Sequence, residues 1–201
     1  SPAAAALLER SVRLNGLDSV VQVLNAAAAA PGHQGSIRLR AKPRSSNSFA
    51  DFSHVADSEA GSEGSMVDVP AICVDDILPF QHVDLLISHT NGQELSVLRG
   101  ASRLLSHPRS ATQVILQLYG LGTGVVHAPD YVPERAARWL ASHGYDVRLA
   151  KKPGRRFNTP GAMTGYFHDP DVQHIVNVLG IKRRRPTMRG LPQPSMPKGV
   201  S

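Results

Sequence analysis

The sequence VDLLISHTNGQELSVLRGA, residues 83–101, determines the fold that we expect for this chain. It opens with an apolar run, residues 83–87, whose length is typical of a buried β-strand. A polar loop follows, and then a helix in which Val97, Leu98 and Ala101 lie on one face. Ligands of open α/β sheets bind outside the carboxyl ends of the strands. We therefore expect a ligand site in this polar loop, at the end of a central strand.

Apolar periodicity predicts further elements on both sides of this stretch. Helices are predicted at residues 1–16 and 133–143, and strands at residues 20–24, 35–40, 67–71, 113–118, 145–149, 164–168 and 175–179. The strand at 67–71 contains Pro70, which favours the edge of a sheet. The strands at 164–168 and 175–179 are expected to complete the sheet edge, and residues 41–66 form a long loop. Because strands alternate with helices, the predicted class is α/β, with a mostly parallel sheet flanked by helices.

The composition indicates one domain with a real core, because 201 residues are too few for two large domains. No apolar run approaches the roughly 20 residues that a membrane span requires. The single cysteine, Cys73, excludes an internal disulfide and favours an intracellular, reducing compartment, cytoplasm or organelle. The opening segment lacks the features of a signal peptide. Because the first residue is Ser1, we expect a fragment or a processed product.

Positive charge is concentrated in the last quarter of the chain. Residues 1–149 hold 12 basic and 14 acidic side chains, whereas residues 150–201 hold 10 basic and 2 acidic ones. The segment 182–201 carries Pro, Arg and Met without periodicity and is predicted to be a disordered tail. Its charge suits RNA or another polyanion, although it lacks aromatic residues for base stacking. The alternative is a solvated tail that aids solubility.

The stretch 83–101 resembles the FkbM-type, SAM-dependent methyltransferases, whose equivalent segment reads roughly VDLLKIDVEGAELEVLRGA. The match is close at both ends and poor in the middle. RLNGL, VQVLNAA and the turn CVDDIL follow the order of the same family, so the resemblance covers roughly residues 1–150. It implies an incomplete Rossmann-like, class I methyltransferase domain at residues 1–180, followed by a basic tail at 181–201.

The resemblance also implies S-adenosylmethionine as cofactor and a hydroxyl group on a small molecule or sugar as methyl acceptor. In this register Ser1 lies just past the second strand, so the Gly-rich turn and the ribose-binding carboxylate precede the chain. The remaining cofactor-binding candidates are Asn25, Ala26, Ala27, Gly92 and Gln117. For Asn25 the alternative is a plain turn at the end of a strand.

The catalytic candidates implied by the resemblance are His89, Asn91 and Glu94. His89, Asn91 and Gln117 stand where the family commonly has acidic residues, so polar volume is kept and negative charge is lost. An amide cannot act as a general base. His89 has the right unperturbed pKa for a base, or it is a hydrogen-bonded structural residue. Glu94 matches the family, and the helix dipole favours an acid in the first turn.

Two other patterns bear on a cofactor or metal site. Residues 114–124, VILQLYGLGTG, imitate a Gly-rich cofactor turn, but no helix begins directly at the glycines, as phosphate and cofactor binding would require. The histidines show no paired metal-ligand spacing, and a single cysteine excludes a thiolate zinc site, so we expect no metal.

Two functions remain from the sequence. The first is a methyltransferase-like domain of the FkbM type, truncated or impaired in this chain. The second is a non-catalytic methyltransferase-like scaffold, a pseudoenzyme, held in a larger assembly such as a ribonucleoprotein by its basic tail. Fold alone does not distinguish them.

Overall fold

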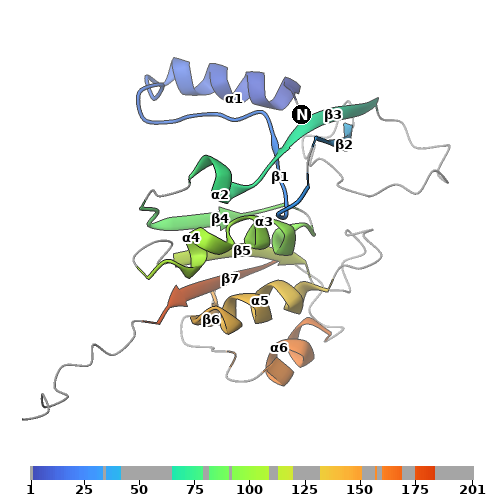
Figure 1. The fold of residues 1–201 in the computed structure, drawn as a ribbon, viewed down its shortest axis with the longest axis vertical. Coiled ribbons are helices and arrows are strands. Elements are labelled where there is room, and N and C mark those ends of the chain that lie inside the picture. The colour runs from blue at the N-terminus through green and yellow to red at the C-terminus, as the bar shows by residue number, and fades with distance from the viewer. Residues whose placement is uncertain are drawn as a thin grey trace, which may run out of the picture.

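The structure is a computed structural model, and it describes residues 2–33, 35–41, 65–78, 82–90, 92–108, 113–119, 132–150, 157, 160–168 and 175–183. Figure 1 shows the elements in space. In chain order they are α1 (Pro2–Leu14), β1 (Ala27–Ala28), β2 (Ser36–Ala41), β3 (Ser65–Ile72), α2 (Val74–Ile77), β4 (Leu85–Ser88), α3 (Glu94–Gly100), α4 (Ser102–Ser106), β5 (Gln113–Tyr119), α5 (Pro133–Ser142), β6 (Tyr145–Leu149), α6 (Pro160–Phe167) and β7 (Ile175–Lys182).

Four strands form the larger sheet, in the spatial order β4-β5-β7-β6 (Figure 1). β4 and β5 run parallel, whereas β7 runs antiparallel to both of its neighbours. The chain is therefore α/β, as predicted, but its sheet is mixed and the expectation of a mostly parallel sheet is wrong. The physical reason is that apolar periodicity reports how deeply a strand is buried and carries no information about its direction.

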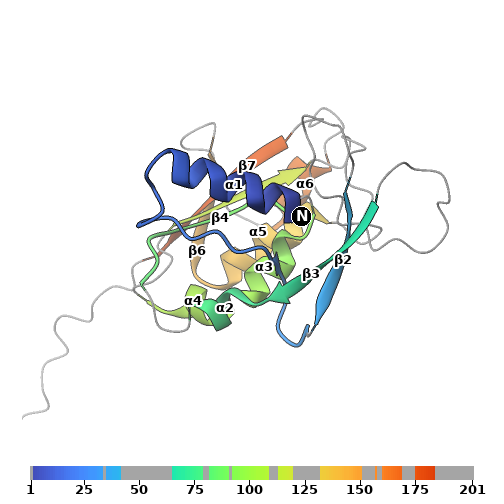
Figure 2. The same ribbon diagram turned by 90° about the horizontal axis from the view of Figure 1, so that it is seen from above.

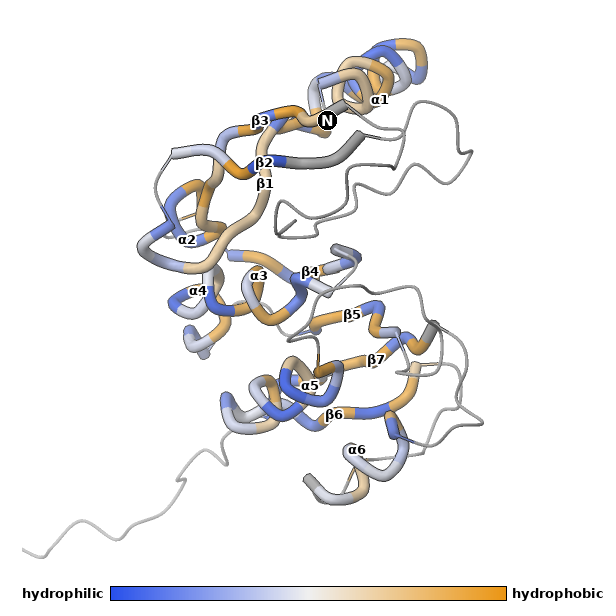
Figure 3. Tube along the Cα trace, turned by 90° about the vertical axis from the view of Figure 1, so that its right-hand side faces the viewer, coloured by the Kyte–Doolittle hydropathy of each residue, from blue (hydrophilic) through white to orange (hydrophobic). Residues whose placement is uncertain are grey.

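One face of the larger sheet carries the hydrophobic core. Successive side chains of a strand point to opposite faces, and on the core face of β5 Val114, Leu116 and Leu118 are all buried. Figure 3 shows α3, α4 and α5 on the same side of β5 and β7. From these helices Leu98 and Leu140 are completely buried against the strands. The core of the chain therefore lies between this one sheet face and three helices.

The strand β4 lies at the margin of the larger sheet, so the expectation of a central strand at residues 83–87 is wrong for the described chain. Leu85 and Ile87 point to the face opposite the core, and their exposed fractions are 43% and 63%. The sequence of a short apolar run does not distinguish an edge strand, paired on one side, from a central strand, paired on both sides. Its position in the sheet depends on which other strands are available to pair with it.

A smaller sheet has the order β1-β3-β2, and Figure 2 shows β2 and β3 side by side at one side of the molecule. Its middle strand contains Pro70, so the prediction of an edge strand here is wrong. Ala71 N–H donates to Gly35 O at 2.9 Å, which makes Pro70 opposite Ser36 a non-hydrogen-bonded pair with β2. On its other side, pairing with β1 begins only at Ala71. The missing N–H of the proline therefore costs no ladder bond.

Gly100 lies where α3, which packs on the larger sheet, contacts the segment just after β1 of the smaller sheet. A Cβ atom at this position would lie 2.0 Å from the carbonyl oxygen of Ala29, just after β1. Only glycine allows backbone to approach a helix this closely. Ala29 N–H in turn donates to Ile72 O at 2.9 Å, which ties the same segment to β3. The glycine of the RGA sequence is thus explained by the crossing of β1 over α3.

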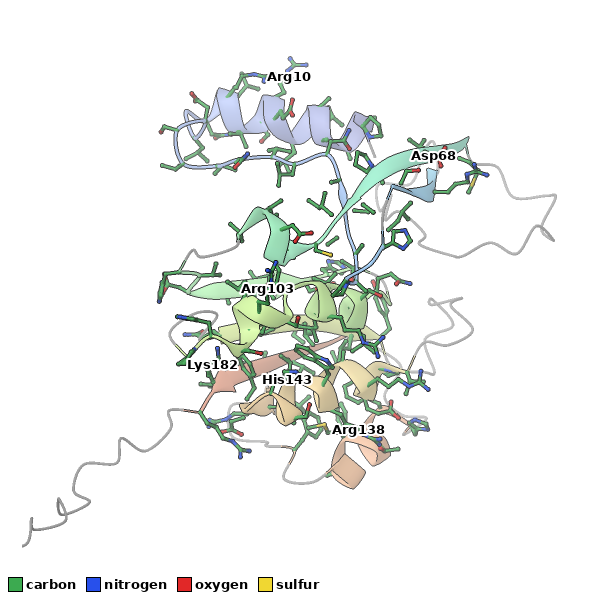
Figure 4. The ribbon with its side chains drawn as sticks, in the orientation of Figure 1. Arg10, Asp68, Arg103, Arg138, His143 and Lys182 are labelled. Carbon is green, nitrogen blue, oxygen red and sulfur yellow. The ribbon has the colours of Figure 1, made fainter. Side chains whose placement is uncertain are left out.

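Asp75 forms a second joint, between α2 and α4. It is 5% exposed, and its carboxylate accepts hydrogen bonds from Arg103 N–H at 2.8 Å and Leu104 N–H at 2.9 Å. These are amides of the first turn of α4, which has no side-chain cap of its own. Arg103 reaches back to Asp75 O and to the Asp76 carboxylate (Figure 4). The predicted helix after the polar loop is therefore interrupted at Ala101, and a tertiary carboxylate caps its second part.

The amino-terminal helix is confirmed as α1, but it buries only Val12. The segment that follows it, residues 20–24, forms no strand, so that prediction is wrong. Its β-branched residues favour an extended conformation, but a strand also needs a hydrogen-bonding neighbour. None of the described strands pairs with this segment. Val20 is accordingly 76% exposed and Leu24 46% exposed.

The carboxyl-terminal predictions are partly wrong. Of residues 164–168, predicted as a strand, 164–167 form the end of α6 and His168 is in the turn after it; Met163 and Phe167 recur at helical spacing and are buried. The strand predicted at 175–179 is confirmed as β7, but it lies inside the sheet. Since β7 extends to Lys182, residues 181 and 182 belong to the sheet. Of the loop predicted at 41–66, Ala41 belongs to β2 and Ser65 and Met66 belong to β3. Residues 42–64 and 184–201 lie outside the described residues.

Candidate functional site at the carboxyl ends of β4 and β5

Two parallel strands end at the same edge of the larger sheet and bring two ring side chains together there. His89 follows the last residue of β4, and Tyr119 is the last residue of β5. His89 Nε2 lies 3.5 Å from Tyr119 Oη. His89 is exposed, whereas Tyr119 is 3% exposed. A histidine open to solvent thus lies above a buried phenol.

Gln117 joins these residues by register. The ladder pairs Leu85 with Gln113 and Ile87 with Ile115, so His89 comes level with Gln117, one step past the last pair. All of these side chains point to the sheet face opposite the core. The Oε1 atom of Gln117 is buried and has no hydrogen-bond partner among the described residues. A buried, unpartnered acceptor is uncommon in folded proteins.

The polar loop between β4 and α3 is held by Glu94. This residue is 1% exposed. Its Oε1 accepts from Thr90 N–H at 3.0 Å and from Thr90 Oγ1 at 3.2 Å, and its Oε2 accepts from Gly92 N–H at 3.1 Å. Gly92 has φ 105°, a conformation that favours glycine. The carboxylate therefore shapes the loop that positions His89.

Electrostatics at the site favour a neutral phenol. Burial, and secondarily the Glu94 carboxylate, raises the pKa of Tyr119 above its usual value. Tyr119 therefore keeps its proton at neutral pH and can donate a hydrogen bond. Gln117 Oε1, buried and without a described partner, adds an acceptor on the same sheet face, so the site contains one donor and one acceptor.

The structure brings together only part of the predicted site. His89, Gly92, Glu94 and Gln117 lie at or beside the carboxyl ends of β4 and β5. Asn91 lies outside the described residues, as do residues 120–124 of the alternative Gly-rich turn.

The proposed adenine-side residues lie elsewhere. Ala27 is 3% exposed and pairs with Ala71 in the smaller sheet. The chain two residues further on meets α3 at Gly100, the helix end opposite Glu94. Asn25, Ala26 and Ala27 therefore lie in or just before the smaller sheet, whereas Gly92 and Gln117 lie at or beside the carboxyl ends of β4 and β5. The described residues do not fit a complete site for S-adenosylmethionine, and we derive no step through that cofactor.

Sequence reasoning missed Tyr119 and Thr90. Tyr119 follows directly after the strand predicted at 113–118, so the rule that sites form at the carboxyl ends of parallel strands pointed to it. Thr90 gave no signal, because its role depends on the fold of the loop around Glu94.

The basic tail was predicted to begin near Lys182, but this residue is part of the fold. Lys182 Nζ donates to His107 O at 2.6 Å and lies 5.3 Å from the ring centroid of Tyr145 (Figure 4). Burial lowers the pKa of its ammonium group. Any polyanion-binding residues of the tail therefore follow it.

Comparison of the chain with protein-family models, with curated proteins and with solved structures found no match. Among the described residues there is no cluster of three or more His, Cys, Asp or Glu side chains that could hold a metal ion. None of the helices in the described ranges combines the length and the apolar character that crossing a membrane requires.

Proposed function

We propose that this chain is a methyltransferase-like α/β domain of the FkbM type, impaired in its cofactor-binding half. In this proposal it retains a site for a hydroxyl-bearing small molecule or sugar. One observation carries the proposal: the buried Gln117 acceptor, the Tyr119 phenol and His89 lie together at the carboxyl ends of two parallel strands. That is where ligands of α/β sheets bind.

The fold class is consistent with the same proposal. The larger sheet is of the α/β class, with a parallel pair, β4 and β5, and helices packed against one face. The resemblance of residues 83–101 to the family adds to this, and Gly100 within that stretch has a packing role.

In the site, we expect a ligand hydroxyl to donate to Gln117 Oε1 and to accept from Tyr119 Oη. The hydrogen bond would remove the cost of a buried, unpartnered acceptor, about 1–3 kcal/mol. His89 lies beside the phenol and is exposed, so it is the group placed to accept a proton from the bound hydroxyl. S-adenosylmethionine remains the proposed donor of the family fold, but no described residues of this chain are assembled to hold it.

A panel of monosaccharides and polyols, added to the isotopically labelled chain, tests the proposal by NMR. We expect saturable shifts of the amide signals of His89, Gln117 and Tyr119, lost in Gln117→Leu. Ser106→Ala, at the far end of α4, is the control and should leave the shifts unchanged. Absence of saturable shifts across the panel would contradict a retained hydroxyl site.

Titration with S-adenosylmethionine tests the impairment separately. We expect no saturable heat, because the predicted cofactor residues are not brought together. Saturable heat that disappears in Gln117→Leu would show an intact cofactor site and would refute this part of the proposal.

A second candidate, the non-catalytic scaffold, is favoured by Glu94. The hydrogen bonds that its carboxylate accepts from Thr90 and Gly92 lie within its own loop, so this carboxylate has a structural role. This function predicts that neither ligand class binds. It also predicts RNA retention that weakens with salt and is lost when residues 184–201 are deleted; retention that survives the deletion would remove the tail from this account.

A further inference from the structure

The outer edge of β4 has backbone groups that no described strand pairs with. Gln113 N–H donates to Asp84 O at 3.2 Å, so residues 84, 86 and 88 direct their backbone groups at β5. In a parallel ladder the alternate residues direct theirs the other way. Leu85 and Ile87 therefore present N–H and C=O groups on the side of β4 away from β5.

Among the described residues, this edge also lacks the features that normally prevent strand addition. Natural proteins protect exposed edges with lysine, proline, bulges or a covering element. The four residues of β4, LLIS, contain no charge and no proline. Leu85 and Ile87, which carry the outward backbone groups, are 43% and 63% exposed. The edge is thus suited to receive an extended, apolar strand.

The same chain carries an unpaired segment with the composition of a strand. Residues 20–24 read VVQVL, and they belong to no helix or strand. Among the described residues, no backbone carbonyl accepts a hydrogen bond from the N–H groups of Gln22, Val23 or Leu24. Val20, Val21 and Leu24 are 76%, 40% and 46% exposed. In Figure 1 this segment runs beneath α1, apart from β4.

We propose that two copies of this chain exchange these segments. Residues 20–24 of each copy add to the outer edge of β4 in the other copy, which extends each four-stranded sheet by one strand. Two-fold symmetry requires a surface that complements itself. One unpaired strand-forming segment and one unpaired edge on each chain meet that requirement, and exchange of an identical element is a known route to dimers.

The apolar surface available supports a second copy as the occupant. Large apolar side chains are exposed on α1, on the segment after it and on β4, namely Leu7, Leu8, Leu14, Leu17, Val20, Val21, Leu24, Leu85 and Ile87. Each is at least 40% exposed, and they lie on the two surfaces that the exchange would bring together, where a standard interface buries about 800 Å² per partner. Pairing of two β4 edges alone would leave most of this surface in water, whereas exchange carries the amino-terminal segment onto the partner.

This inference does not depend on the proposed function. Strand exchange occurs at the outer edge of β4, whereas the hydroxyl site lies at its carboxyl end. Ligand shifts at Gln117 and the mass of the assembly are separate measurements, so either proposal can fail without the other.

Light scattering on the full chain, over a wide range of concentration, tests the exchange. We expect a dimer, and we expect Val21→Lys and Ile87→Lys each to weaken it by more than about tenfold. Met66→Lys is the matched control, because Met66 is 44% exposed and lies on β3, and it should leave the dimer intact. Circular dichroism checks that the variants stay folded, as expected for exposed positions.

A mixture of the two variants gives the sharper result. The Ile87→Lys chain keeps an unchanged segment 20–24, and the Val21→Lys chain keeps an unchanged β4 edge. In a mixed dimer, the segment of the first chain can therefore add to the β4 edge of the second, so that one of the two contacts forms. We expect heterodimers in the mixture and monomers in each variant alone. A dimer joined edge to edge through β4 would not be rescued by mixing, and that result would overturn the proposal.

A wild-type chain that stays monomeric would overturn it as well. Hydrogen exchange would then identify the other occupant: protected amides at Leu85 and Ile87 indicate a segment of the same chain, and unprotected amides indicate an edge left for a different partner.

Discussion

The two sheets of this molecule bury their apolar residues to very different extents. The larger sheet packs one face against α3, α4 and α5, and its core includes completely buried side chains such as Leu98, Leu116 and Leu140. The smaller sheet has a cluster of only Ala27 and Val69, with Ile37 and Val67 partly buried beside it. α1 buries one residue, and in Figure 4 its Arg10 points away from the rest of the molecule.

The difference shows that apolar composition alone does not build a core. Leu7, Leu8 and Leu14 of α1 are as apolar as the leucines of α3, yet they are more than half exposed. What the carboxyl-terminal region has in addition is a sheet face wide enough to receive three helices. The amino-terminal region contacts the carboxyl-terminal region at Gly100, which lies against Ala29, and at Asp75, which caps α4. Substitutions at these two contacts and in each region test the difference between the regions.

The largest effect is expected for Leu98→Ala. Leu98 is completely buried in the core, so the substitution should lower the free energy of unfolding by about 2–5 kcal/mol. Leu8→Ala, in α1 with 54% exposure, should change it by less than about 0.5 kcal/mol. Urea denaturation of both variants measures the contrast, and equal losses would show that α1 packs as tightly as α3.

Gly100→Ala tests the joint between β1 and α3. The added Cβ would lie 2.0 Å from Ala29 O, so the segment must move, at a cost of about 3 kcal/mol. Gly165→Ala is the matched control, because it lies in α6 with no atom within 4 Å of the added Cβ. It should stabilise the chain by about 0.5–1 kcal/mol. Thermal denaturation gives the sign of both changes, and a neutral Gly100→Ala would mean that β1 does not cross α3 here.

Asp75→Ala tests the second joint. The substitution leaves the Arg103 and Leu104 amides of α4 without an acceptor, and we expect a loss of about 2 kcal/mol. Asp76→Ala removes only the ion pair of a carboxylate that is 70% exposed, and should cost less than about 1 kcal/mol. Chemical denaturation of both variants decides whether the cap or the ion pair holds α2 to α4.

The smallest effect is expected for Tyr145→Phe in the carboxyl-terminal core. Tyr145 Oη donates to Leu105 O at 3.3 Å, so the loss near neutral pH should be about 1 kcal/mol. Burial raises the pKa of the phenol above its usual value. Its stabilisation is therefore complete below the unfolded-state pKa of about 10 and decreases as pH rises above it. Unfolding measured from neutral to alkaline pH should show this decrease in the wild type and a smaller one in Tyr145→Phe.

Several elements could be predicted from local sequence signals. The helices at α1, α3 and α5 follow from apolar spacing, and α5 begins at Pro133 as the rule for first helical positions indicates. The strands at β5 and β6 follow from apolar runs and alternation. The polar loop after β4 was predicted as a site because strand ends in α/β proteins bind ligands, and His89 and Gln117 do lie at that edge.

Other features depend on partners distant in sequence. Tyr119 is placed against His89 by the register of β4 and β5, and Asp75 caps a helix that starts 27 residues later. The segment at residues 20–24 has the composition of a strand and yet forms none. Local sequence patterns do not predict these contacts, because the hydrogen-bond partners are distant in sequence and meet only in the folded chain.

The sequence by itself determined the helices α1, α3 and α5, the strands β5 and β6, and which of their faces are apolar, because these properties depend on residues within a few positions of one another. The tertiary structure alone decided that β7 is reversed, that β4 lies at a margin, and that Glu94 holds its own loop. Strand direction, strand order and hydrogen-bond partners depend on pairing between segments that are distant in sequence. The same residues can form a parallel or an antiparallel strand, at the edge or inside a sheet, and the neighbouring strands decide which.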